Sequence, residues 1–348
     1  DLGAATATGT LKATAANDLS LTEAITADSV DFEATSGDLS QAADKKVTFN
    51  ETADYEAGTS VTLGEVEASG GGSGDLTATA GSGDVAFKNA VNVADLTATA
   101  SGGGNITQTS SGDLAVSGDA DLTADTDITL DKADNDFQGA VDADGNNVAL
   151  EDGSGGLTLG NVDAGGTLDA TSTDGAIDQK NGTTIQSTGK ATLTASDQND
   201  PATPYDITLD EATNDFSTVD ANGANITLSD ANNLTLGAVT ANSKLDATAK
   251  NKLDLAGTVK AANADLTSSD DAITQSDGTL EVTTGPTNLG ADTTVTLDKA
   301  NDFVGPVNVL GGTDITLNDT DDLDLGAATA TGTLKATAAN DLSLTEAI

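Results

Sequence analysis

The amino-acid sequence predicts an all-β fold, a parallel β-helix (β-solenoid) built from tandem repeats. Three observations lead to this prediction. The chain repeats part of itself without change, apolar and polar residues alternate over short stretches, and the large side chains that fill a thick globular core are scarce. A quasi-one-dimensional stack of repeats accounts for all three, because each unit buries its faces against its neighbours.

The longest repeat is an identity between two distant segments. Residues 324–348 repeat residues 1–25 letter for letter. We therefore interpret residues 1–323 as one full tandem repeat of a continuous solenoid, and residues 324–348 as the start of the next copy. On this interpretation the chain is a segment of a longer periodic protein, and the joint at Asp324 marks no domain boundary.

Inside the large repeat we identify four diverged modules of about 80 residues. Each opens with an apolar-Thr-apolar phrase and continues, seven or eight residues after the start of that phrase, with an acidic residue and an aromatic one. The phrases are Val47–Thr52, Ile128–Ala133, Ile207–Ala212 and Val295–Ala300, and the pairs are Asp54-Tyr55, Asp136-Phe137, Asp215-Phe216 and Asp302-Phe303. The modules therefore begin near residues 47, 128, 207 and 295.

Two further phrases recur once in each module. A Leu-Thr-Leu-Gly phrase or a close variant stands at Val61–Gly64, Leu157–Gly160, Leu234–Gly237 and Leu323–Gly326, and an apolar-x-Gln phrase stands at Leu39–Gln41, Ile106–Gln108, Ile177–Gln179 and Ile273–Gln275. In the first module the Leu-Gly phrase follows the aromatic residue after only a few positions. This short spacing predicts that part of a coil is missing there.

Short strands are predicted wherever apolar residues occupy alternate positions. Leu76–Ala80, Leu96–Ala100 and Ile315–Leu317 show this period of two, which gives a strand one buried and one solvated face. We expect strands of about three to five residues, with turns at polar and Gly-rich clusters such as Ser69–Gly74 and Asp144–Asn147. No helical periodicity extends beyond about two turns.

The module spacing predicts coils of roughly 20 residues, four to a module and about sixteen to the large repeat, or on the order of 75–80 Å of stacked strands. Six Phe, two Tyr and no Trp, Met, Cys or His leave an aliphatic core that is narrow. An array of β-sandwich domains, one per module, is the alternative. It requires longer strands and a more aromatic core.

The chain is strongly acidic. Thirteen lysines stand against 57 acidic residues, a formal net charge of −44. This charge repels nucleic-acid phosphates and anionic membranes, so we expect no nucleic-acid partner, and no apolar run is long enough to span a membrane. High charge also suggests disorder, but a disordered chain has no reason to keep a period of two.

Catalytic machinery is hard to assemble from these residues. Without His or Cys, a Ser–His or Cys–His nucleophile is impossible within this segment, and without Arg there is no guanidinium clamp. A pair of carboxylates on a β-helix could still cleave a polysaccharide. The many aspartates of this chain are, however, explained by the preference of Asp for turns. We expect no enzyme, and we assign no catalytic, cofactor-binding or metal-binding residue. Gly71–Leu76 misses the calcium-binding nonapeptide pattern by one place. The remaining expectation for metal ions is weak divalent binding by the acidic surface.

The recurring polar residues are interpreted as structural. We expect the aromatic ring of each Asn-Asp-Phe triplet to fill a wide corner of the core while Asn and Asp close the turn before it; a comb of ligand contacts is the alternative. The glutamines Gln41, Gln108, Gln179 and Gln275 are expected to satisfy backbone groups at corners. Outward pairs such as Thr77/Thr79 and Thr97/Thr99 suggest an ice-binding face, but they appear scattered through the modules.

Asn214-Asp215-Phe216, Asn225–Leu228 and Leu234–Ala241 resemble the repeat region of filamentous-haemagglutinin-like exoproteins, large adhesins exported by two-partner secretion. The resemblance implies a right-handed parallel β-helix at the cell surface or outside the cell. Its function would be the structural shaft of a giant bacterial surface protein or extracellular fibre, serving adhesion or cell–cell contact. The expected partners are further copies of the same repeat, end to end or within one long chain, and host cells, neighbouring cells or glycans. Polysaccharide binding or cleavage and ice binding are the alternatives.

Overall fold

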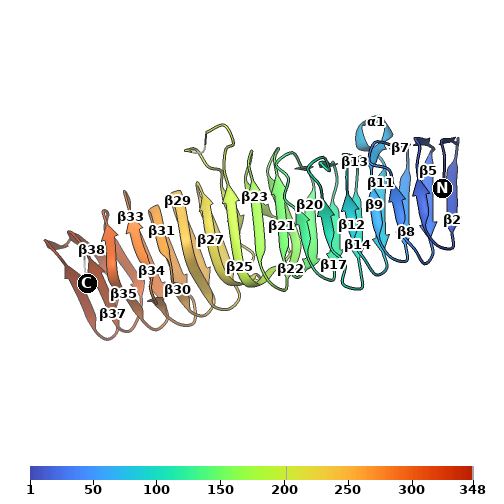
Figure 1. Ribbon diagram of the computed structural model, residues 1–348. Helices are drawn as coiled ribbons and strands as arrows, with labels where there is room; N and C mark the ends of the chain where they lie inside the picture. Colours follow the sequence, from blue (N-terminus) through green and yellow to red (C-terminus); the bar gives the residue numbers. More distant parts are fainter. Residues whose placement is uncertain (201, 347–348) are drawn as a thin grey trace. The chain divides into compact units, whose positions relative to one another are not determined.

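The computed structural model describes residues 1–200 and 202–346. The chain divides into two compact units, Asp1–Gly175 and Ala176–Ile348. Each unit is a parallel β-solenoid, in which every coil lays its strands beside the equivalent strands of the coils before and after it (Figure 1). The predicted all-β fold is confirmed.

The first unit has three ladders of parallel strands, and each coil before Leu157 contributes one strand to each ladder. The first ladder contains β1 (Ala5–Thr6), β4 (Ile25–Thr26), β7 (Lys46–Phe49), β10 (Glu65–Ala68), β13 (Val91–Val93), β16 (Leu114–Val116) and β19 (Asp136–Phe137). The second contains β2 (Thr10–Ala15), β5 (Ser29–Ala34), β8 (Thr52–Ala57), β11 (Asp75–Ala80), β14 (Leu96–Ala100), β17 (Ala120–Ala124), β20 (Ala140–Gly145) and β22 (Leu157–Ala164). The third contains β3 (Leu19–Leu21), β6 (Leu39–Gln41), β9 (Val61–Leu63), β12 (Val85–Phe87), β15 (Ile106–Gln108), β18 (Ile128–Leu130), β21 (Val148–Asp152) and β23 (Leu168–Ser172).

The second unit uses the same parallel pairing, but several strands run through a corner and join two ladders. Its strands are β24 (Ile177–Gln179), β25 (Ile185–Ala195), β26 (Ile207–Leu209), β27 (Asp215–Gly223), β28 (Ile226–Asp230), β29 (Leu234–Ala249), β30 (Leu253–Leu255), β31 (Thr258–Ser268), β32 (Ile273–Gln275), β33 (Thr279–Val282), β34 (Thr287–Ala291), β35 (Val295–Phe303), β36 (Val307–Gly311), β37 (Ile315–Asp319), β38 (Leu323–Ala328), β39 (Leu334–Ala338) and β40 (Leu342–Leu344). The longest of them, β29, pairs with β28, β30 and β31.

Coils close to the predicted length set the register. Leu76 pairs with Leu96, and Leu245 pairs with Ala264. Each inward residue therefore stacks on an inward residue of the next coil, about 4.8 Å away. Ala78 and Ala98, one such pair, are both completely buried. The aliphatic stack that results is the narrow core that the composition predicts.

Two details depart from the expected strands and turns. Strands reach 16 residues in β29 instead of the expected three to five, because the extended backbone continues through the corners, although the alternation of buried and exposed residues is interrupted there. The Gly-rich cluster after β10 contains a single helical turn, α1 (Ser69–Gly72), where only a turn was expected. Both departures leave the inward stack of the coils intact.

The Leu-Gly phrases mark a bulge in the later modules. The register of β20 on β22 shifts between Val141 and Ala143, and the same shift occurs in β27 on β29 and in β36 on β38. A Cβ at Gly237 would meet the carboxylate of Asp220, which accepts a hydrogen bond from the Ala238 N–H (2.9 Å). The glycine therefore leaves room for a side chain of the preceding coil to satisfy the bulged backbone.

The first module is built differently from the other three. Val47 lies in β7 and pairs with Val66, in the first ladder, whereas Ile128 lies in the third ladder, one coil after Ile106. The strand that lies one coil after the apolar-x-Gln phrase Leu39–Gln41 is β9, which begins at Val61. In register, Val61–Leu63 and not Val47–Phe49 is therefore the counterpart of Ile128–Leu130.

Candidate functional site

The best-organised polar chemistry of the described chain is a hydrogen-bonded pair of side-chain amides, one Gln and one Asn, that occurs three times. In each case a Gln Nε2 donates to an Asn Oδ1, and the Asn Nδ2 donates back to the Gln Oε1. The pairs are Gln108–Asn135 (2.8 and 3.0 Å), Gln179–Asn214 (2.7 and 2.8 Å) and Gln275–Asn301 (2.5 and 3.1 Å). All three asparagines are fully buried. Two reciprocal hydrogen bonds fix both amides in one orientation.

The asparagine also holds the backbone on both sides of it. Asn214 Oδ1 accepts from the Ile185 N–H (2.9 Å), and its Nδ2 donates to the Leu209 carbonyl. The glutamine spans the corner next to it, since Gln179 Nε2 donates to the Thr183 carbonyl (3.1 Å). The prediction that the glutamines satisfy backbone groups at corners is confirmed. The asparagine does more than close a turn, because it ties together backbone from two neighbouring coils.

A buried aspartate completes each group one coil later. Asp152 Oδ2 accepts from the Phe137 N–H (2.7 Å) and its Oδ1 from the Ser154 N–H (2.8 Å). Asp230 binds the Phe216 N–H and the Asn232 N–H in the same way, and Asp319 binds those of Phe303 and Asp321. We call each set of Gln, Asn and Asp a polar bracket: Gln108–Asn135–Asp152, Gln179–Asn214–Asp230 and Gln275–Asn301–Asp319. The phenylalanine between Asn and Asp is buried in every bracket, as predicted.

Burial sets the charge state of these aspartates. Removal from water raises the pKa of Asp152 from its ordinary 3.8 to about 6, although the two backbone N–H donors oppose the shift. The pKa of Asp230 is raised to about 6 for the same reason, and that of Asp319 is also raised. The carboxyl groups of Asp152 and Asp230 therefore titrate near pH 6, well above the ordinary range of an aspartate in water.

Sequence reasoning missed the three aspartates. The signal was present: alternation from Val148 through Leu150 places Asp152 on the inward face, and the same count applies to Asp230 and Asp319. Tyr55 was wrongly aligned with the three phenylalanines. It lies in β8 against Phe32 (ring centroids 5.4 Å apart), and its hydroxyl donates to Gln41 Oε1 (3.1 Å). In the first module a phenol therefore satisfies the glutamine that an asparagine satisfies elsewhere.

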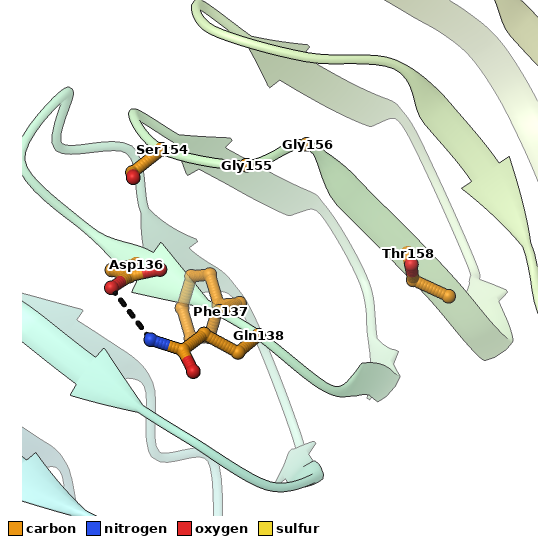
Figure 2. Close-up of a pocket in the computed structure, with 7 residues that line it drawn as sticks. All are labelled: Asp136, Phe137, Gln138, Ser154, Gly155, Gly156 and Thr158. Carbon is orange, nitrogen blue, oxygen red and sulfur yellow. Dashed lines mark hydrogen bonds between the residues drawn. The ribbon is translucent and has the colours of Figure 1, made fainter.

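A shallow depression of about 310 Å³ lies beside the bracket of the second module (Figure 2). It is lined by Asp136–Gln138, Ser154–Gly156 and Thr158, and Gln138 Nε2 donates to Asp136 Oδ2 (3.0 Å). Gly155 and Gly156 have φ values of +88° and +99°, which favour glycine. This loop is one residue longer than its counterpart after Asp230. The depression can hydrogen-bond a hydroxyl-bearing ligand, but the Phe137 ring beneath it is buried and offers no stacking surface.

The Thr-x-Thr pairs are not scattered, as the sequence suggested, but adjacent. Thr77 pairs with Thr97 and Thr79 with Thr99 in β11 and β14, so the four hydroxyls form a square on one face. Acidic residues lie opposite three of its corners, Asp54 opposite Thr77, Glu56 opposite Thr79 and Asp121 opposite Thr97, whereas Thr123 lies opposite Thr99. The surface that carries both threonine columns is therefore two coils wide, and the Thr79–Thr99 column continues to Thr123 on a third coil.

Across residues 1–200 and 202–346 no group of three or more acidic side chains is arranged to hold a metal ion. Within the same described part of the chain, no helix has the length and apolar character needed to cross a membrane.

The stacked coils and the recurring brackets define a tandem-repeat β-solenoid protein. The chain belongs to the family described as "Repeats of unknown function (DUF5649)", whose model matches residues 73–144, 145–222, 223–254, 247–310 and 312–347. Within each of the stretches 73–144, 145–222 and 223–310 lies one Gln–Asn pair, while the aspartate that completes the bracket lies in the stretch that follows. No curated protein and no solved structure matches the chain.

Proposed function

We propose that the chain is a section of the structural shaft of a secreted bacterial surface protein or extracellular fibre, which serves adhesion or cell–cell contact. In this proposal the shaft has no catalytic role, and further copies of the same repeat are its main partners. The supporting observation is that the duplicated sequence forms the same coil in both copies and can pack against a neighbouring coil on either face.

The duplicated sequence adopts the same internal register in both copies. Leu2 pairs with Leu21 in the first copy, and their equivalents Leu325 and Leu344 pair in the second. The first copy is followed by a coil, since Leu11 pairs with Val30. The second copy is preceded by a coil, since its equivalent of Leu11, Leu334, pairs with Ile315. One sequence therefore accepts neighbours on both faces, as a repeat that joins without a seam requires.

The outward face supports the same role. Lys12 Nζ lies 2.7 Å from Asp31 Oδ2 on the next coil, and Lys260 binds Glu281 in the same manner. These ion pairs are exposed and screened by water, so they add little stability, and the large excess of carboxylates keeps the surface solvated. Such a surface suits a long particle that must not bundle with its neighbours.

The test is to label cells of the source organism with gold-tagged antibodies raised against the purified chain. The proposal expects gold on extracellular fibres, at intervals of roughly 75–80 Å or multiples of that length. Gold confined to the cytoplasm would refute it. Incubation of the purified chain with a panel of polysaccharides tests the absence of catalysis, and release of reducing ends would count against a purely structural role.

A further inference from the structure

The chain contains two Asn-Gly dipeptides, Asn181-Gly182 and Asn222-Gly223, and the structure places them in opposite settings. An asparagine side chain before glycine is open to attack by the backbone nitrogen of that glycine, because glycine has no Cβ to hinder the approach. The second dipeptide lies inside β27, where it is paired with strands of the coils before and after it. This pairing on both sides holds its backbone extended.

The first dipeptide forms the centre of an exposed corner. The Thr183 N–H donates to the Lys180 carbonyl (3.2 Å), and Gly182 has a φ of +77°, as in a type II turn. Asn181 and Gly182 are both exposed, and within residues 1–200 and 202–346 the Asn181 side chain has no hydrogen-bond or ionic partner. A Cβ at Gly182 would meet nothing within 4 Å. The Asn181 amide is therefore unrestrained, and the nitrogen that follows it is open to approach.

A carboxylate of the next coil is placed to take the proton of that nitrogen. The Gly182 N–H donates to Glu211 Oε1 at 2.9 Å. The N–H bond lies in the plane of the peptide, whereas attack on the side chain uses the face of that plane. Glu211 can therefore keep its hydrogen bond while the nitrogen approaches the Asn181 Cγ. A carboxylate in this position has the geometry of a general base.

We propose that Asn181 is a site of spontaneous deamidation, with Glu211 as the proton acceptor. The Gly182 nitrogen forms a bond to Asn181 Cγ, the bond from Cγ to Nδ2 breaks, and the proton taken by Glu211 leaves on ammonia. Water then opens the cyclic imide that results. Attack of water at Cγ gives aspartate, and attack at the main-chain carbonyl carbon gives isoaspartate, in which the backbone runs through Cβ and Cγ.

The two products differ in their effect on the polar bracket of the third module. Two residues after its glutamine the fourth module carries Asp277, so an aspartate at this distance is compatible with a bracket. Isoaspartate instead adds an atom to the main chain between Gln179 and Thr183. The hydrogen bond from Gln179 Nε2 to the Thr183 carbonyl (3.1 Å) closes this corner, and a longer main chain separates its ends. Formation of isoaspartate therefore loosens the bracket.

The test follows the full chain during incubation at neutral pH, with peptide mass spectrometry as the readout. Deamidation, with isoaspartate among the products, is expected at Asn181 at least about tenfold faster than at Asn222, because attack at Asn222 requires the paired strands to open first. Equal rates at the two asparagines, faster reaction at Asn222 or an unmodified Asn181 would each overturn the proposal.

The variant Glu211→Gln tests the proton acceptor. It keeps an acceptor for the Gly182 N–H but removes the base, so deamidation of Asn181 should slow by at least about threefold. The control Glu56→Gln removes an exposed carboxylate from the first unit and should leave the rate unchanged. Circular dichroism confirms that both variants keep the fold. Equal rates in the two variants would overturn the assignment of Glu211.

Hydrogen exchange tests the link to the bracket. The isoaspartate fraction of the incubated chain should exchange faster in β24 and β26 than the fresh chain. The freshly purified variant Asn181→Asp, which carries the ordinary product, should exchange like the fresh chain. Unchanged protection in the isoaspartate fraction, or equal loss of protection in Asn181→Asp, would overturn this link.

Discussion

Replacement of Asn214 by alanine tests whether the polar bracket holds neighbouring coils together. The substitution removes the partner of two groups, the Oε1 of the half-buried Gln179 and the buried N–H of Ile185, while Gln179 Nε2 keeps its bond to Thr183. At about 1–3 kcal/mol for a buried group left without a partner, and less for the half-buried amide oxygen, the free energy of unfolding should fall by roughly 1–4 kcal/mol. The exposed Asn181, two residues after Gln179, provides the control substitution Asn181→Ala.

The assay must be local, because a repeat protein need not unfold in one step. Hydrogen exchange followed by mass spectrometry should show faster exchange in β24 to β28, and unchanged protection in the first unit. Gln179→Ala and the double variant complete a cycle in which the paired amides show a coupling of about 1–2 kcal/mol. The reasoning fails if Asn214→Ala stays within about 0.5 kcal/mol of Asn181→Ala, or if the two single effects simply add.

Three further predictions concern charge, turns and the first module. Burial raises the pKa of Asp152 and Asp230 from an ordinary 3.8 to about 6. Between these two values the folded chain binds more protons than the unfolded chain, which stabilises the fold. This stabilisation is fully present below about pH 4 and is lost as the pH rises through 6. Thermal midpoints should therefore rise as the pH falls from 7 to 5, with a gain of about 1–2 kcal/mol for each aspartate, and Asp230→Asn should reduce the slope; a slope unchanged by that substitution would contradict the assignment. Gly153→Ala should lower the free energy of unfolding in urea by about 2–4 kcal/mol, since the new Cβ would meet a carbonyl of the preceding coil. Gly9→Ala, with open space around it, should have no effect, and equal effects of the two substitutions would argue against the close approach. Tyr55→Phe should lower the local stability by about 1 kcal/mol, because Gln41 Oε1 loses its hydrogen-bond donor. Hydrogen exchange in the surrounding coils measures this loss, and an unchanged exchange rate would show that water replaces the phenol.

Much of the fold could be predicted because the period of two, the recurring phrases and the scarcity of large side chains all agree. The alignment of the first module could not be settled by phrases alone, since Asp54-Tyr55 looks like the later Asp-Phe pairs. The spacing between phrases gives the correct alignment, because Val61 follows Leu39 at the same interval at which Ile128 follows Ile106 and Val295 follows Ile273.

The polar brackets were predicted in part. Gln and Phe were assigned to corners and core because their chemistry there is ordinary, and the structure agrees. Asp152 was overlooked because aspartate near the end of a strand usually forms a turn in solvent. Only the stack of coils reveals that this carboxylate faces the N–H of Phe137 on the coil before it. A contact between residues of different coils leaves no local signature in the chain.

The bracket also bears on how a gene for such a protein can change length. Each bracket takes its Gln and Asn from one family repeat and its Asp from the next, so no repeat is complete by itself. A duplication or deletion of a whole period preserves every bracket wherever its breakpoints fall, since the residue lost from one side is restored from the other. An insertion or deletion that is not a whole number of periods leaves a buried amide or carboxylate without its partner. Unequal recombination can therefore lengthen or shorten the protein in whole steps with no compensating mutation, and selection removes the intermediate lengths.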